Sequence, residues 1–268
     1  MTTQTTQPAQ IGQRIKRRED PRLLHGQGQY VADITPPQTA HVAFLRSPHP
    51  HARIVSVDAA GARGMAGVVA VFTGADLQGK VGEVPCGWVL PNMKMPPHPV
   101  IAVDKVRYQG DIVAALVADS NEAAQDALMA IRVEYEALPA VVNQEQAILP
   151  GAPVLHEVAP DNIAFNWSIG GGDVPKAFSE AGVVVKQRII NQRLIPNPME
   201  TRGVVAQWDA GTGELTVWTS TQAPHLIRLL LALVNGLEEQ KIRVIAPDVG
   251  GGFGSKIYLY AEEMALSY

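Results

Sequence analysis

Three consecutive glycines, Gly250 to Gly252, lie just beyond the predicted strand 242–245 and constrain the fold more than any other feature of the chain. Glycine has no Cβ atom, so this loop can adopt backbone angles that other residues avoid. Its N–H groups can converge on an anion, to which Lys256 would add a positive charge. Residues 258–268 are helix-like, and a strand, a glycine loop and a helix together suit a phosphate or a phosphate-bearing cofactor. A tight turn without a ligand is an equally good interpretation, because glycine-rich turns are common.

The loop matches neither of the glycine motifs that are typical of nucleotide folds. Residues 250–256 read GGGFGSK, which is neither GxGxxG nor GxxxxGK followed by Ser or Thr. We therefore reject a nucleotide-binding fold on this motif.

Residues 219–225 form a second polar element, which closes a predicted strand and opens a predicted helix. Gln222 would lie at the strand end, where its amide could donate a hydrogen bond to a ligand oxygen. The alternative is that Ser220 or Thr221 caps the helix and Gln222 is only solvated. Taken alone, capping is the commoner use of such residues.

The first half of the chain predicts a domain of mixed strands and helix. Short apolar runs alternate with turn residues, and residues 121–130 have apolar positions at helical spacing behind the caps Asp119 or Ser120. Residues 79–99 are rich in Pro and Gly and predict a long irregular loop. Strands are expected at 41–45, 53–57, 67–72, 112–118 and 131–135.

The proline-rich stretch from Pro139 to Asn166 predicts a linker between two domains. Beyond it we expect strands at 181–194, 203–208, 214–219 and 242–245, and a helix at 224–237. The predicted organisation is a disordered tail at 1–12, a first domain at 13–139, a linker at 140–166 and an incomplete second domain at 167–268.

Charge and cysteine content exclude several classes of protein. The 268 residues carry a formal net charge of −4, which gives no support to nucleic-acid binding. The single cysteine, Cys86, cannot hold an iron–sulfur cluster, and we expect a buried, inert thiol. No apolar run approaches the ~20 residues of a spanning helix, and residues 1–10 contain no apolar signal segment. We therefore expect a cytoplasmic protein.

Several segments together resemble one enzyme family. The Thr-Gln pair at 221–222 is followed by GGGFG at 250–254, with Gln222 lying 31 residues before Phe253. This pattern is similar to the one found in the large subunits of molybdenum hydroxylases. These include xanthine dehydrogenase, aldehyde oxidoreductase and aerobic carbon monoxide dehydrogenase. The PMETR of 198–202 is similar to the family's PMEPR, with Thr201 in place of proline. Further matching segments are 18–30, 45–52, 106–111 and 133–139.

The resemblance implies an α+β fold, with an α/β hammerhead domain followed by the beginning of the molybdopterin-binding domain. The family's counterpart of Gln222 hydrogen-bonds an oxo ligand of molybdenum, which makes Gln222 the candidate catalytic residue. The counterparts of 252–254 line the metal site and contact the pterin through the backbone. The candidate cofactor-binding residues are Gln222, Gly250, Gly251, Gly252, Phe253 and Gly254. No direct metal ligand is expected from this chain.

The resemblance also implies a cofactor, partners and a reaction. The cofactor would be molybdopterin with molybdenum, in the cytosine dinucleotide form frequent in bacteria. Electrons would leave through an iron–sulfur subunit and a FAD-binding medium subunit, in a dimer of heterotrimers when complete. The reaction would be hydroxylation of an aldehyde, an aromatic N-heterocycle or carbon monoxide, with water as oxygen source. Residues 86–99 favour the carbon-monoxide-dehydrogenase-like branch.

The chain departs from the family pattern in its length. The family's catalytic glutamate and most pterin contacts would lie beyond Tyr268, so we expect a fragment or one piece of a split subunit, inactive alone. Glu262 and Glu263 are expected on an ordinary helix surface. Two alternatives stay open: a truncated, non-catalytic binding or assembly module of the same fold, and an unrelated phosphate-binding protein.

Overall fold

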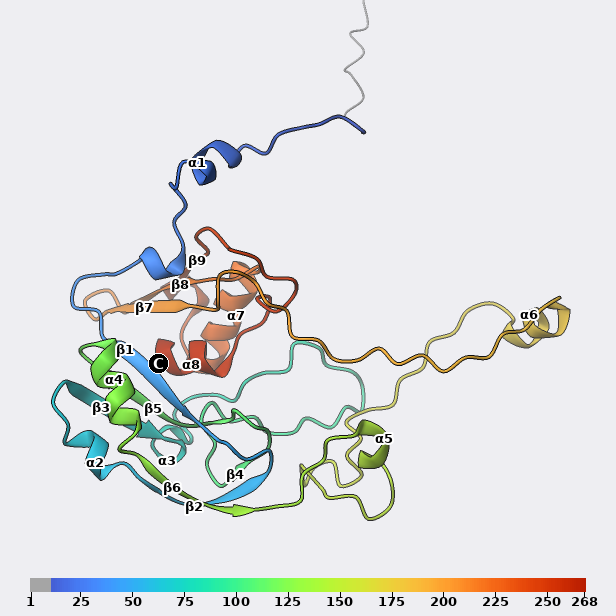
Figure 1. Cartoon of the computed structure of the whole chain (residues 1–268), viewed down its shortest axis with the longest axis horizontal. Helices are drawn as coiled ribbons and strands as arrows, with labels where there is room; N and C mark the ends of the chain where they lie inside the picture. The colour runs from blue at the N-terminus through green and yellow to red at the C-terminus, as the bar shows by residue number, and fades with distance from the viewer. Residues whose placement is uncertain (1–10) are drawn as a thin grey trace, which may run out of the picture.

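The computed structural model describes residues 11–268, which form mixed helices and strands in two packed parts (Figure 1). The predicted α+β class is thereby confirmed. Apart from residues 11 and 12, the predicted tail at 1–12 lies outside the described residues. None of the helices in the described part has the length and apolar character that crossing a membrane requires.

The first part contains two three-stranded antiparallel sheets. One sheet has the order β1-β5-β3 and the other the order β4-β2-β6. The strands are β1 (His41–Arg46), β2 (Ala52–Asp58), β3 (Val68–Thr73), β4 (Lys105–Val106), β5 (Ile112–Ala118) and β6 (Arg132–Ala137). The short helices α2 (Ala60–Arg63) and α3 (Gly74–Leu77) contact β3, whereas α1 (Asp20–Leu24) and η1 (Val31–Asp33) belong to the N-terminal segment, which runs beside the second part (Figure 1).

The sequence explains the centre of this part. β5 is a continuous apolar run, and it is buried along nearly its whole length between β1 and β3. Helix α4 (Asn121–Leu128) begins at Ser120, whose side chain accepts a hydrogen bond from the N–H of Ala123. The predicted strands and helix of this half are confirmed, and residues 79–99 contain no regular element, as expected.

The second part is a three-stranded sheet crossed by one helix. β7 (Val204–Asp209) pairs antiparallel with β8 (Glu214–Thr219), and β8 pairs parallel with β9 (Ile242–Ile245). Helix α7 (Pro224–Asn235) makes the crossover, and its C-cap is Gly236, whose φ of 64° is left-handed. The short helix η2 (Glu239–Lys241) leads into β9, and α8 (Ala261–Ser267) follows the glycine loop.

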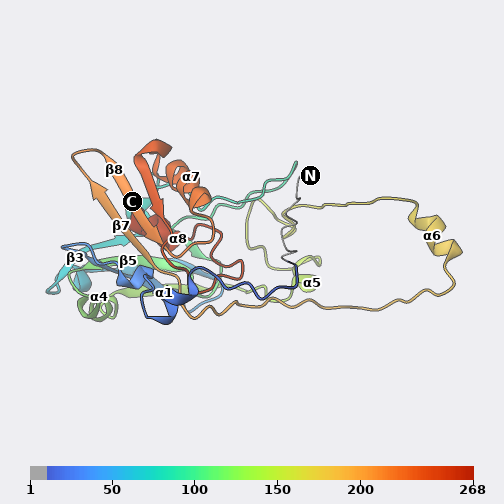
Figure 2. The same cartoon turned by 90° about the horizontal axis from the view of Figure 1, so that it is seen from above.

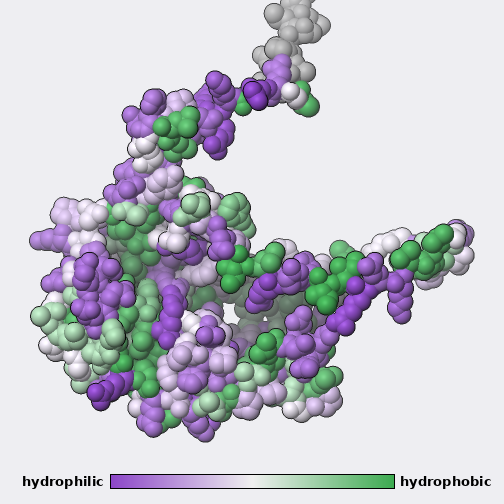
Figure 3. Space-filling view, in the orientation of Figure 1, coloured by the Kyte–Doolittle hydropathy of each residue, from purple (hydrophilic) through white to green (hydrophobic). Residues whose placement is uncertain are grey.

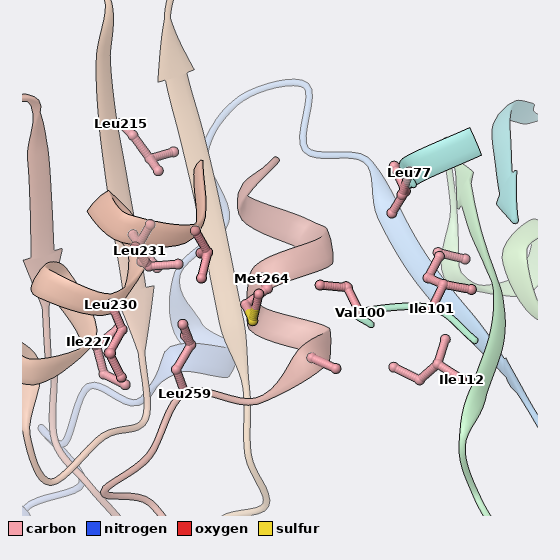
Figure 4. Packing of buried hydrophobic residues seen from close by; sticks show 14 of the residues in the cluster. Leu77, Val100, Ile101, Ile112, Leu215, Ile227, Leu230, Leu231, Leu259 and Met264 are labelled. Atoms are coloured by element: carbon pink, nitrogen blue, oxygen red, sulfur yellow. The ribbon is translucent and has the colours of Figure 1, made fainter. Parts of the chain in front are cut away.

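A shared apolar cluster joins the two parts (Figure 4). The first part contributes Leu77, Val100, Ile101, Ile112 and Ala115, and the second part contributes buried residues of β8, α7, β9 and α8. The glycine loop lies between β9 and α8, so this core fixes both of its ends.

Residues 167–199 project from the body as a long arm with α6 (Val174–Glu180) near its tip (Figures 1 and 2). The strand predicted at 181–194 is wrong, because these residues form no strand in the structure. A strand needs a neighbour to bond its N–H and C=O groups, and no other strand of residues 11–268 pairs with this segment. Val183 and Ile189 of this segment are exposed. Figure 3 shows hydrophobic residues at the surface along the arm.

Residues 140–166 are loop-rich and contain only the short helix α5 (Gln144–Ala147). The Asn162 amide nitrogen donates to the carbonyl oxygens of Ala147 and Pro153, which folds this stretch on itself. The division into a first domain at 13–139, a linker at 140–166 and a second domain at 167–268 stays a proposal.

Candidate functional site

The loop after β8 places Gln222 directly against the glycine loop. Its backbone N–H donates to the carbonyl oxygen of Lys256 over 2.8 Å. Its side-chain Oε1 accepts a hydrogen bond of 3.0 Å from the N–H of Gly254. This bond fixes the amide orientation, so the Nε2 hydrogens point away from Gly254. Within residues 11–268 no hydrogen bond from Nε2 is formed, and Gln222 presents a free donor at an exposed position.

Two glycines of the loop make approaches that no larger residue allows. A Cβ atom on Gly252 would lie 2.4 Å from Oε1 of Gln222, and one on Gly250 would lie 2.5 Å from Cβ of Glu200. Gly251 has a φ of 96°, a left-handed conformation that L residues rarely adopt. The loop therefore requires glycine at these positions for close packing and for backbone shape.

The loop also carries unbonded N–H groups on consecutive residues. Within the described part of the chain, no protein atom accepts a hydrogen bond from the N–H of Gly251, Gly252 or Phe253. Consecutive free N–H groups of this kind attract anions and other electron-rich groups. Phe253 itself has a φ of 52°, and its side chain is 72% exposed. A large apolar residue held in this unfavourable conformation and exposed to solvent is a feature typical of binding sites.

Lys256 does not face the loop's ligand side, which corrects the prediction that it adds a positive charge there. Its side chain is fully buried, and Nζ donates to the carbonyl oxygen of Glu200, to Oε2 of Glu200 and to Oγ of Ser220. The three bonds measure 2.8, 2.9 and 2.7 Å and use all three ammonium hydrogens. The positive charge is thereby satisfied inside the protein.

Glu200 is the acceptor at the centre of this cluster. Its Oε2 accepts from Ser220, Gly250 and Lys256 over 2.5, 2.8 and 2.9 Å. Burial raises the pKa of the carboxyl, but the bonds from Ser220, from the Gly250 N–H and from Lys256 outweigh it and hold the pKa below its ordinary value. Glu200 is therefore ionised at neutral pH.

A second buried carboxylate corrects another prediction. Glu263 is only 4% exposed and does not lie on the helix surface. It accepts hydrogen bonds from Arg202 and Thr219, each over 2.5 Å, and from the N–H of Tyr260. Glu262 is partly exposed and pairs with Arg46 of β1, so it links α8 to the first part.

Two further expectations are corrected. The N-cap of α7 is Ala223, without a side-chain cap, because Ser220 is engaged by Glu200 and Lys256. Thr221 Oγ1 accepts from the N–H of Ala223, just before the helix. Cys86 is exposed rather than buried.

The segment 18–30 reaches the start of the glycine loop. Arg22 donates two hydrogen bonds of 2.6 Å to the carboxylate of Asp248. The backbone N–H of Gln29 donates to Oδ2 of Asp248, and the N–H of Asp248 donates to the carbonyl oxygen of Gln29. The bonds from Arg22 lower the pKa of Asp248 to about 2. The N-terminal segment thus braces the loop from outside.

The structure brings all the predicted site residues together, and it adds residues that the sequence analysis did not assign. Glu200 and Arg202 reach the site from the PMETR segment, whose similarity to a family motif was the only available signal. Ser220 was assigned as a helix cap instead of a partner of Glu200.

Two family models account for most of the chain. Residues 25–139 match the aldehyde oxidase and xanthine dehydrogenase a/b hammerhead domain, and residues 155–268 match the molybdopterin cofactor-binding domain. The chain belongs to the xanthine dehydrogenase and aldehyde oxidase family of molybdenum hydroxylases. This membership confirms the predicted fold and excludes an unrelated phosphate-binding protein.

The family relatives are larger proteins. The chain is 38% identical over 256 residues to the nicotine 6-hydroxylase large subunit of Paenarthrobacter nicotinovorans, covering 96% of this chain and 31% of the relative. It is 40% identical over 265 residues to the carbon monoxide dehydrogenase large chain of Afipia carboxidovorans, covering 94% and 32%. The solved structure of quinoline 2-oxidoreductase from Pseudomonas putida 86 has a TM-score of 0.83 and 40% identity, covering 94% and 32%. The chain thus spans about a third of the length of these relatives.

Proposed function

We propose that this chain forms one wall of the cofactor site in the large subunit of a molybdenum hydroxylase related to carbon monoxide dehydrogenase and nicotine hydroxylase. The observation that carries the proposal is the orientation of Gln222. Its Oε1 is engaged by the N–H of Gly254, and its Nε2 is left as a donor beside the free N–H groups of 251–253. A metal–pterin cofactor is rich in acceptor atoms, and these donors fit it.

In this proposal the chain's own residues bind the cofactor and orient it. Gln222 donates to an acceptor atom of the cofactor, and the N–H groups of Gly251, Gly252 and Phe253 hold it through the backbone. Gly250 and Gly254 shape the loop, since Gly250 accommodates Glu200 and Gly254 positions the Gln222 amide. When bound, molybdenum would supply the two-electron oxidation of the substrate, with water as oxygen source. The cytosine dinucleotide form of molybdopterin is the form we propose.

The complete enzyme would add the remainder of the large subunit, which supplies the catalytic base. An iron–sulfur subunit and a FAD-binding medium subunit would carry the electrons away, in a cytoplasmic dimer of heterotrimers. The substrate class we propose is an aldehyde, an aromatic N-heterocycle or carbon monoxide, in keeping with the names of the relatives.

Replacing Gln222 in the full-length subunit tests the proposal. Gln222→Ala removes one preorganised donor, and such a loss typically lowers kcat by about 10²–10³-fold. Gln222→Glu should be worse than its shape suggests, because a carboxylate repels electron-rich groups. The measurement is kcat together with molybdenum content and the thermal midpoint. The matched control is Gln207→Ala, an exposed glutamine on β7.

The outcomes separate the possible roles of Gln222. Wild-type turnover of Gln222→Ala at full molybdenum loading would show that the assigned role is wrong. A lowered thermal midpoint with unchanged turnover per molybdenum would give the residue a structural role only.

A further inference from the structure

A buried ion pair lies directly behind the proposed cofactor wall. Lys256 is fully buried, and Glu200 has 16% of its side chain exposed. Their charged atoms are 2.9 Å apart, and Ser220 bonds to both. The ammonium of Lys256 and Oε2 of Glu200 form their hydrogen bonds with Glu200, Ser220 and Gly250, and within residues 11–268 neither atom bonds to the side chain of Gln222.

Lys256 holds Gln222 through its main chain. Its carbonyl oxygen accepts the N–H of Gln222 over 2.8 Å and the hydroxyl of Thr221 over 2.9 Å. The turn that carries the Gln222 amide is therefore anchored to Lys256, which follows the glycine loop.

The side chain of Lys256 holds the other end of the loop through Glu200. Glu200 Oε2 accepts the N–H of Gly250 over 2.8 Å, and the N–H of Glu200 donates to the carbonyl oxygen of Gly250 over 3.2 Å. Both the N–H and the C=O of Gly250 are thus hydrogen-bonded to Glu200. The ion pair and the main chain of Lys256 together fix the separation between Gln222 and both ends of the loop.

Net stability is a weak explanation for such a pair. The free energy needed to remove two charges from water offsets most of the free energy gained from their attraction. Apolar side chains of similar volume therefore often stabilise the folded state equally well. What apolar side chains cannot supply is the set of directional bonds to Gly250, Ser220 and the Glu200 carbonyl. What this pair contributes, and apolar side chains would not, is the fixed position of the groups to which it is hydrogen-bonded.

We propose that Glu200 and Lys256 are positioning residues, which align the glycine loop with the Gln222 amide and so shape the cofactor wall. The part of this inference that concerns the cofactor rests on the proposed function. The alignment of the loop itself does not, and it can be measured without the metal.

Hydrogen exchange of the full-length subunit tests the alignment. Lys256→Met removes the charge at similar volume and leaves Glu200 without its ion. We expect the amides of Gly250 and Gly254, the two hydrogen-bonded N–H groups of the loop, to exchange about 10–100-fold faster, because a lost charged hydrogen bond shifts local opening by that factor. The amides of α7 should be unchanged. The matched control is Lys80→Met, an exposed lysine outside the site.

The double variant Glu200→Gln, Lys256→Met keeps the test valid if the single variant fails to fold, because it leaves no unpaired buried charge. We expect its thermal midpoint to approach that of the wild type, while loop exchange stays at least about tenfold faster and molybdenum content falls. Wild-type loop exchange and molybdenum content in this variant would overturn the proposal and leave the pair a purely structural role.

The two proposals fail in different ways. If the full-length subunit binds no molybdenum, the proposed function is wrong, while loop exchange still reports whether the pair aligns the loop. If Gln222→Ala loses turnover but the double variant exchanges and loads like the wild type, the function stands and the positioning role falls.

Discussion

At Gly252 the side chain of Gln222 lies so close to the glycine loop that a Cβ atom would not fit. The sequence identified both residues, because a strand-end Gln and a GGGFG loop at this spacing resemble one family. It did not identify the direction of Lys256. A lysine beside glycines suggests an anion site, but only three-dimensional packing reveals that Glu200, far along the chain, takes up its charge.

Gly252→Ala is expected to impair the site without unfolding the protein. The added Cβ would lie 2.4 Å from Oε1 of Gln222, so the amide must move, and its exposed side chain can swing into solvent. Turnover in the full-length subunit should fall about as far as for Gln222→Ala, by about 10²–10³-fold, with a nearly unchanged thermal midpoint. Gly171→Ala, with open space around it, is the control. Wild-type turnover would contradict the close approach.

Among the helices and strands, local pattern succeeded wherever the partner lies in the same part of the chain. β5 is one apolar run and finds β1 and β3 on its two sides, and α4 has its cap at Ser120. The segment 181–194 has the same apolar character and no strand beside it within residues 11–268, so it remains extended and unpaired. An apolar sequence pattern shows that a segment can form a strand, but a strand forms only where a neighbouring strand is present to pair with it.

The arm makes a prediction about proteolysis of the isolated chain. A protease that cleaves before large apolar residues should cut first at 183–195, where Val183 and Ile189 are more than four-fifths exposed and no backbone bonds hold the segment. Residues 140–166 should be cut later, because Asn162 ties that stretch together. Mass spectrometry of the early fragments gives the order, and first cleavage at Val142 or Ile148 would contradict it.

On the scale of the whole molecule, the proposed site is open on one side. Phe253 is 72% exposed, and the chain spans about a third of its relatives. We expect the isolated 268-residue chain to hold no stoichiometric molybdenum and to show no hydroxylase activity. Metal analysis of the purified chain is the measurement, and close to one molybdenum atom per chain would contradict the expectation.

The contact between Arg22 and Asp248 predicts a pH-dependent release of the N-terminal segment. The folded pKa of Asp248, about 2, is lower than the ordinary 3.8, so the contact is at full strength above about pH 4 and is lost as pH falls toward 2. The protection of residues 18–30 against hydrogen exchange, relative to the intrinsic rate at each pH, should fall across that window before that of α4 does. Asp248→Asn should show the faster exchange already at neutral pH. Equal protection of 18–30 at both ends of the window would argue against the contact.

The same contact has a consequence for how the protein is made. Arg22 and Asp248 are 226 positions apart, so the N-terminal segment leaves the ribosome long before its anchor exists. At a translation rate of about 5–20 residues per second, Asp248 is synthesised about 10–45 s after Arg22. During that time the segment is a free end, while β1, β5 and β3 can already form their sheet. The N-terminal segment can therefore brace the glycine loop only after the first part has been synthesised and its sheets can have formed.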